Sequence, residues 1–166
     1  MSALAAARDA YVALGSNLGH SLQTLQQAVT DLGRLPGTEV VACSRFYRTP
    51  PWGVHDQPDF INAVVRLRTA LSPHELLDAL MAIEGAAGRE RDGRRWGPRT
   101  LDLDLLHMDG VTLDDPRLTL PHPRIHERAF VLAPLADVAP QLDVPGQGTV
   151  AQLLQRVDCT GCTVLA

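Results

Sequence analysis

The sequence contains no lysine, so each of its fifteen cationic side chains is an arginine. A P-loop needs a lysine to contact the nucleotide phosphates, and Schiff-base catalysis needs a lysine amine. Both kinds of site are therefore excluded. Arginine carries a planar, permanently charged guanidinium that binds phosphate through two hydrogen bonds. This chain can therefore still bind phosphate through arginine side chains.

Aromatic side chains are scarce, at 4% of the residues, and the formal net charge is −4. Nucleic-acid-binding domains need a basic surface, and RNA-binding sheets also need exposed aromatic residues on which bases stack. We therefore expect no nucleic-acid partner. A non-catalytic RNA-binding or regulatory module is the least favoured of the functions that we consider.

Cysteines, targeting signals and long apolar runs are also limited. The cysteines are Cys43, Cys159 and Cys162. The C-T-G-C segment could be a redox or metal pair, but a zinc site needs four ligands and no matching second pair is seen, so reduced thiols are favoured. Residues 1–8 lack a basic stretch, and no apolar run could span a bilayer. We expect a cytoplasmic protein without a membrane partner. An apolar fraction of 45% predicts one folded domain, residues 1–166.

The segment from Arg89 to His107 joins an arginine-rich loop to an alternating strand pattern. Side chains two apart on a strand share a face, so Asp102 and Asp104 point one way and the intervening leucines the other. Two carboxylates about 7 Å apart favour a divalent cation, and Mg²⁺ is commonly held by carboxylates together with substrate phosphates. The upstream arginines can neutralise those phosphates. The segment predicts a Mg²⁺-dependent enzyme that acts on a polyphosphate.

Hydrophobic periodicity predicts the order of the elements. Ser72, Pro73 and Glu75 give one helix a capped start. The core elements are expected at 9–15 (strand), 21–33 (helix), 38–48 (strand), 59–69 (strand), 73–84 (helix) and 101–105 (strand). This β-α-β-β-α-β order is that of the ferredoxin-like α+β fold, an antiparallel sheet with helices on one face and the other face partly open. Extra C-terminal elements are expected at 118–120 (strand), 126–138 and 150–157 (helices) and 163–165 (strand).

The strand expected at 59–69 separates two kinds of side chain. The odd-numbered residues from 61 to 67 are apolar and would meet the helices, whereas Phe60 and Asn62 lie on the opposite face. Phe60 is equally compatible with core packing. An aromatic ring beside an amide otherwise suggests a flat ligand with polar edges. Alternation alone places these two side chains on the face that carries Asp102 and Asp104.

Five motifs together carry a family resemblance. They are A-L-G-S-N-L-G (13–19), F-Y-R-T-P-P-W-G (46–53), D-Q-P-D-F-I-N-A-V (56–64), R-W-G-P-R-T-L-D-L-D-L-L (95–106) and L-P-H-P-R-I-H-E-R-A-F-V-L-A-P-L (120–135). In this order they resemble the 6-hydroxymethyl-7,8-dihydropterin pyrophosphokinases of folate biosynthesis. The resemblance implies transfer of the β,γ-diphosphate of ATP to the pterin hydroxymethyl group, with release of AMP. It also implies ATP as co-substrate, two Mg²⁺ ions and, as we expect, a monomer.

The resemblance further implies a role for individual residues. Asp102 and Asp104 match the residues that hold the two Mg²⁺ ions, and Arg89 and Arg99 match arginines that contact the reacting phosphates. The residues that match positions around the nucleotide are Glu84, Arg91, Leu105, Arg117, Thr119, His122 and Arg128. The residues that match positions around the pterin are Thr49, Trp52, Phe60, Asn62, Trp96 and Phe130.

Some residues stay outside the expected site, and one substitution sets the chain apart. Arg94 and Arg95 are taken as part of a solvated turn, and Arg124, His126 and Glu127 are likewise left out of the expected site. Pro123 stands where some members of the family have a tyrosine.

The alternative enzyme class is a Mg²⁺-dependent nucleotidyl or cyclase-type transferase, because such enzymes also carry paired aspartates on a similar sheet. That class releases pyrophosphate instead of AMP.

Overall fold

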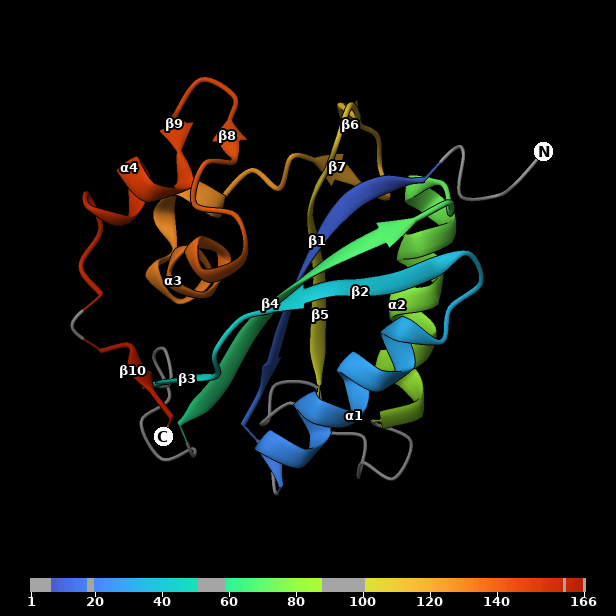
Figure 1. Ribbon diagram of the computed structural model, residues 1–166, viewed down its shortest axis with the longest axis horizontal. Coiled ribbons are helices and arrows are strands. Elements are labelled where there is room, and N and C mark those ends of the chain that lie inside the picture. Colours follow the sequence, from blue (N-terminus) through green and yellow to red (C-terminus); the bar gives the residue numbers. More distant parts are fainter. Residues whose placement is uncertain (1–6, 18–19, 51–58, 88–100, 160, 166) are drawn as a thin grey trace.

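The computed structural model describes residues 7–17, 20–50, 59–87, 101–159 and 161–165. The longest strands and helices lie in the first two thirds of the chain, and most elements of the last third are short (Figure 1). The core elements are β1 (Arg8–Ser16), α1 (Ser21–Gly33), β2 (Thr38–Cys43), β3 (Tyr47–Thr49), β4 (Phe60–Thr69), α2 (Pro73–Ala87) and β5 (Asp102–Met108). The elements that follow are β6 (Leu113–Asp114), β7 (Thr119–Leu120), a 3-10 turn (Ile125–Glu127), α3 (Ala129–Val138), β8 (Asp143–Val144), β9 (Gly148–Thr149), α4 (Val150–Leu154) and β10 (Thr163–Val164).

The main sheet has the strand order β10-β3-β4-β1-β5, and β2 also pairs with β4. All of these pairings are antiparallel. The β-α-β-β-α-β core consists of β1, α1, β2, β4, α2 and β5. Its four strands lie in the order β5-β1-β4-β2, so β1 and β4 occupy the centre. This arrangement confirms the β-α-β-β-α-β fold that the sequence predicts.

The single strand expected at 38–48 is instead two strands, and Ser44 explains the break. Its backbone N–H donates to the Val64 carbonyl over 2.9 Å, and its hydroxyl oxygen accepts from the Val64 N–H over 2.9 Å. A side chain thus replaces a backbone acceptor, which interrupts the ladder. β2 pairs with the second half of β4, whereas β3 pairs with Phe60, Ile61 and Asn62 at its start.

The apolar faces of β4 and β5 are buried beneath α1 and α2, as the alternation predicts. Leu101, Leu103 and Leu105 are each no more than 6% exposed and join one core with Leu25 of α1 and Leu80 of α2. The predicted capping of α2 is confirmed, because the Ser72 hydroxyl accepts from the Glu75 N–H and a Glu75 oxygen accepts from the Ser72 N–H. The helical layer therefore fixes which face of β5 is left for polar side chains.

A second core covers part of the opposite face, which was expected to be partly open. Tyr11, Val64 and Leu106 project from the sheet into a cluster with Leu132 and Leu135 of α3. Figure 1 shows α3 across the sheet from α1 and α2, above β3 and one end of β4. The nearly apolar sequence of α3 is the physical reason, since such a helix is stable only when most of its surface is buried. No helix in the described ranges is both long enough and apolar enough to cross a membrane.

His107 packs against Tyr11 of this second core, and its protonation state should make stability depend on pH. Its side chain is 12% exposed, and its ring meets Tyr11 edge-on with centroids 5.8 Å apart. Its buried Nδ1 has no hydrogen-bond partner among the described residues. Burial lowers the pKa of His107, although Asp109 and Asp143 act in the opposite direction.

We expect the free energy of unfolding to fall as the pH is lowered from about 7 to about 5, because unfolded histidine titrates near pH ~6.5. The unfolded chain then binds more protons than the folded chain, which favours unfolding. Replacing His107 with Gln should reduce this slope by no more than about 1.4 kcal/mol per pH unit, the value for one proton. Urea unfolding over this pH range measures the slope, and His20→Gln at an exposed position is the control. An unaltered slope in H107Q would contradict the prediction.

Candidate active site

A cavity of about 500 Å³ opens on the face of the sheet that carries α3. Strands β1, β4 and β5 form its floor, and β3, the 3-10 turn and the start of α3 form its walls. Residues that are distant in the sequence therefore meet in one place. The lining residues are Ala13, Leu14, Gly15, Thr49, Pro50, Phe60, Asn62, Ala63, Asp102, Asp104, Arg124, Glu127, Arg128, Phe130 and Val131.

The two aspartates of β5 both line this cavity, as the alternation predicts. Asp102 is half-buried and Asp104 is exposed, whereas Leu103 between them is buried on the opposite face. The backbone N–H of Leu103 donates to Glu84 Oε2 of α2 over 2.7 Å. A charged acceptor thus fixes β5 at the residue between the two carboxylates.

The chemistry of this donor set can be compared with the needs of a metal ion. Within the described ranges, no three His, Cys, Asp or Glu side chains are grouped so that they could hold a metal ion. A cage built only of protein ligands is therefore not formed by these residues. Mg²⁺ usually takes one or two carboxylates and completes its coordination with water and substrate phosphates. The pair Asp102 and Asp104 fits that requirement.

Asn62 is held in a fixed orientation at the floor of the cavity. Its Nδ2 donates to Thr49 Oγ1 over 2.7 Å, and both side chains are buried. Gly15 lies opposite Asn62 in the ladder and opposite Asp102 on its other side. A Cβ at position 15 would lie 3.0 Å from Asn62 Oδ1, so glycine leaves room for the amide. The amide can therefore present hydrogen-bonding groups to a ligand without rearranging.

Phe60 and Phe130 line the cavity from different elements, β4 and α3. The guanidinium carbon of Arg128 lies 5.8 Å from the centroid of the Phe130 ring. A cation over one face of an aromatic ring adds a favourable electrostatic interaction. The cavity thus offers aromatic surface near the buried amide and the paired carboxylates.

His122 lies close to the aspartates although it does not line the cavity. Its backbone N–H donates to the Leu106 carbonyl over 2.7 Å, which attaches it to the edge of β5. Its Nδ1 accepts from the Arg124 N–H over 3.1 Å, so the proton of the neutral ring is on Nε2. Burial lowers the pKa of His122, against the opposing effect of Asp104, and the arginines Arg124 and Arg128 lower it further.

The structure brings together some of the predicted residues and leaves others apart. Seven line the cavity: Thr49, Phe60, Asn62, Asp102, Asp104, Arg128 and Phe130. Glu84, Leu105, Arg117, Thr119 and His122 do not line it, and Arg117 forms an exposed ion pair with Asp78. Trp52, Arg89, Arg91, Trp96 and Arg99 fall outside the described residues.

Two residues that the sequence analysis excluded, Arg124 and Glu127, also line the cavity. They belong to the 3-10 turn that leads into α3, where Arg124 is the N-terminal capping residue. Residues three apart eclipse each other in a 3-10 turn, so Arg124 lies on the same side as Glu127. This spacing was the signal available in the sequence.

The fold and the cavity together define a class of protein. It is a small α+β protein with a cavity that combines two aromatic rings, a buried amide and two carboxylates. Residues 11–140 match the family model of 7,8-dihydro-6-hydroxymethylpterin-pyrophosphokinase. The chain belongs to this family.

Individual relatives agree with the family model. The 2-amino-4-hydroxy-6-hydroxymethyldihydropteridine pyrophosphokinase of Methylorubrum extorquens is 50% identical over 152 residues, which are 92% of this chain and 95% of the relative. The protein of that name from Pseudomonas aeruginosa is 52% identical over 144 residues, which are 87% and 88% of the two chains. The fold is similar to a crystal structure of wild-type Plasmodium falciparum HPPK-DHPS, with a TM-score of 0.69 at 14% identity. That similarity covers 90% of this chain and 41% of the solved one.

Proposed function

We propose that the cavity is the site where ATP and a reduced pterin meet, with the pterin beside Phe60 and the triphosphate beside Asp102. The observation that carries this proposal is that one cavity joins two carboxylates, two aromatic rings and a buried amide. A pterin is flat and has hydrogen-bonding edges, so it is complementary to rings and an amide. A triphosphate is complementary to a cation held by carboxylates.

As a member of its family, the chain transfers the pyrophosphoryl group of ATP to hydroxymethyldihydropterin in folate biosynthesis. It is therefore an ATP-dependent diphosphotransferase with ATP as co-substrate. Transfer of a phosphoryl-type group depends mainly on in-line positioning and on charge neutralisation. The work of the protein is thus to align the hydroxymethyl oxygen with the β-phosphorus of ATP.

In the pterin half of the proposed site, Phe60 and Phe130 stack on the two faces of the ring. Asn62 hydrogen-bonds the pterin edge, and its contact with Thr49 fixes the orientation of the amide. A preorganised amide loses little entropy on binding and rejects ligands that lack the matching groups. Trp52 and Trp96 complete this half in the family pattern.

In the triphosphate half, Asp102 and Asp104 would hold two Mg²⁺ ions. Bound there, the ions would neutralise charge on the transferring phosphates. The Nε2 proton of His122 is available to a phosphate oxygen, because its Nδ1 accepts from the Arg124 N–H. The other proposed nucleotide contacts come from Arg89, Arg91, Arg99, Leu105, Arg117, Thr119 and Arg128.

The organisation of the protein forms part of the same proposal. Residues 1–166 are one pyrophosphokinase domain, which is supported by the return of β10 to pair with β3. We propose a monomer, because every residue assigned to the site comes from the one chain. The proposed compartment is the cytoplasm, where ATP is abundant.

The decisive experiment identifies the nucleotide product. The purified protein is incubated with ATP, Mg²⁺ and 6-hydroxymethyl-7,8-dihydropterin, and the nucleotides are separated. We expect AMP only when all three are present. Release of pyrophosphate would indicate the nucleotidyl-type transferase, and formation of ADP would indicate transfer of a single phosphoryl group. Either product would overturn the proposal.

A separate prediction concerns Glu84, whose carboxylate accepts from the Leu103 N–H. Glu84→Ala should lower kcat by about tenfold, because the buried Leu103 N–H loses its charged acceptor. The backbone of β5 would then move at Leu103, the residue between Asp102 and Asp104. Glu84→Gln should recover most of the rate, since an amide oxygen can accept the same hydrogen bond. Steady-state kinetics and hydrogen exchange of the Leu103 amide test this. Equal loss in both variants would show that the charge of Glu84 matters for another reason.

A further inference from the structure

We propose that Asp137 is a positioning residue for the pterin half of the cavity. It joins α3 to β3 and so sets the separation between Phe130 and the sheet. The inference rests on the proposed function of the cavity, in which Phe130 stacks on the pterin. Asp137 itself does not line the cavity.

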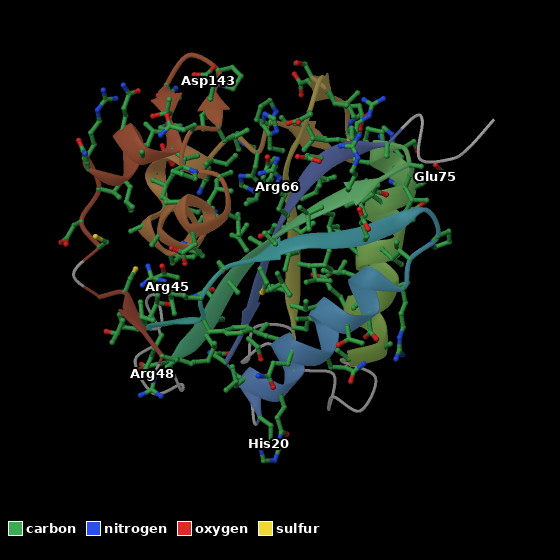
Figure 2. The ribbon with its side chains drawn as sticks, viewed as in Figure 1. His20, Arg45, Arg48, Arg66, Glu75 and Asp143 are labelled. Carbon is green, nitrogen blue, oxygen red and sulfur yellow. The ribbon has the colours of Figure 1, made fainter. Side chains whose placement is uncertain are left out.

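The carboxylate of Asp137 is the centre of a set of contacts, here called the Asp137 cluster, which consists of Asp137, Arg45 and Tyr47. Asp137 Oδ2 accepts from the Tyr47 hydroxyl over 2.8 Å, from the Arg45 backbone N–H over 3.1 Å and from Arg45 Nε over 3.2 Å. Asp137 Oδ1 accepts from Arg45 Nη2 over 3.0 Å. Figure 2 shows Arg45 between α3 and β3. One side chain of α3 thus holds both ends of the short segment from Arg45 to Tyr47, which leads into β3.

The periodicity of α3 relates the Asp137 cluster to Phe130. The two residues are seven positions apart, which is about two helical turns or roughly 10 Å along the axis. They therefore lie on the same side of α3. The N-terminal end of this side presents Phe130 to the cavity, and the C-terminal end presents Asp137 to β3. Movement of the C-terminal end of α3 away from β3 would tilt Phe130 relative to the sheet.

The periodicity of β3 relates the same cluster to Asn62. Tyr47 and Thr49 are two apart and both buried, whereas Arg48 between them is exposed, so the two side chains share a face. The Tyr47 hydroxyl contacts Asp137, and the Thr49 hydroxyl accepts from the Asn62 amide. The Asp137 cluster is therefore connected to both proposed pterin contacts, the ring on α3 and the amide on β4.

The interactions of Asp137 with Arg45 and with Tyr47 differ in strength. The Arg45 side chain is 63% exposed, so solvent screens most of its ion pair with Asp137. Tyr47 is only 4% exposed, and Asp137 is 18% exposed. Burial and the hydrogen bond to Asp137 raise the pKa of Tyr47 to about 12, which keeps its hydroxyl proton in place as a donor. Burial acts to raise the pKa of Asp137, but the hydrogen bonds from Arg45 and Tyr47 outweigh it and lower that pKa.

The test removes only the stronger interaction, the hydrogen bond from Tyr47 to Asp137. Tyr47→Phe deletes one hydroxyl and keeps the ring that fills the core. We expect the KM for the pterin to rise about three- to tenfold, the loss that one hydrogen bond represents, while the KM for ATP changes by less than about twofold. Tyr11→Phe is the matched control, because Tyr11 is 3% exposed, lies on the same face of the sheet and does not line the cavity. Both KM values should stay unchanged in Y11F.

A second pair of variants keeps the inference falsifiable if folding suffers. Asp137→Asn retains an oxygen that can accept from Tyr47, whereas Asp137→Ala does not. The pterin KM should therefore rise in D137A and be largely recovered in D137N. A fall in melting temperature in Y47F or D137A without a change in pterin KM would overturn the inference and leave a purely structural role. A parallel rise in both KM values would overturn it as well.

Phe130→Ala separates this inference from the proposal on which it rests. If F130A weakens pterin binding and Y47F does not, the positioning role of Asp137 is wrong and the cavity assignment stands. If F130A leaves pterin affinity unchanged, the cavity does not bind the pterin as proposed, and the inference falls with that assignment. A titration with the pterin, monitored by calorimetry, provides the affinities independently of turnover.

Discussion

Replacing Asp102 or Asp104 with alanine is expected to lower kcat by about 10³-fold or more, which corresponds to several kcal/mol of lost transition-state stabilisation. The reason is that each carboxylate is proposed to hold a cation against the transferring phosphates. Thermal unfolding should change little, because β5 is held in place by its buried leucines and not by its aspartates. Removal of one of two like charges on a shared face also relieves repulsion.

The measurement is kcat at saturating ATP, Mg²⁺ and pterin, together with a thermal melt of each variant. Asp114→Ala is the matched control, since Asp114 is an exposed strand aspartate that does not line the cavity. The variants should also require higher Mg²⁺ concentrations for any residual rate. Near-normal turnover in either variant would remove the cation-binding role of that aspartate.

Replacing Asn62 with leucine is expected to lower kcat/KM for the pterin by about 10²-fold or more, because a site built for hydrogen bonding loses its donor and acceptor while the ligand keeps its polar edge. Leucine is similar in size to asparagine, so the shape of the cavity is largely preserved. The affinity for ATP should be unaffected, since Asn62 belongs to the opposite half of the proposed site.

Thr49→Ser provides the control for this prediction. Serine keeps the hydroxyl that accepts from Asn62 Nδ2, so T49S should retain most of the pterin affinity, whereas Thr49→Val should lose part of it. Steady-state kinetics with each substrate varied in turn would measure both effects. Equal losses for ATP and for the pterin in N62L would contradict the division of the cavity into two halves.

The strand alternation in the sequence correctly placed four of these side chains together on one face of the sheet. Side chains on a strand alternate between two faces, and the leucines of 101–105 had to be buried. That requirement alone placed Asp102 and Asp104 with Phe60 and Asn62, and the cavity contains all four. The family motifs then added Thr49, Arg128 and Phe130, which alternation could not reach because they lie on other elements.

Other features could not be derived from local patterns. The break between β2 and β3 depends on the contact of Ser44 with Val64, twenty residues away. Arg124 and Glu127 were left out of the expected site, yet the docking of α3 brings their turn to the cavity. Trp52, Arg89, Arg91, Trp96 and Arg99 stay predictions.

The sequence by itself determined the order of the elements, the buried face of each central strand and the family of the protein. Those properties depend on periodicity and on contiguous motifs, which short-range stereochemistry governs. Only the tertiary structure decided that α3 covers the second face, that Glu84 holds Leu103 and that Asp137 joins α3 to β3. Each of these depends on contact between residues far apart in the chain, because the burial of an apolar helix, and not any local pattern, brings them together.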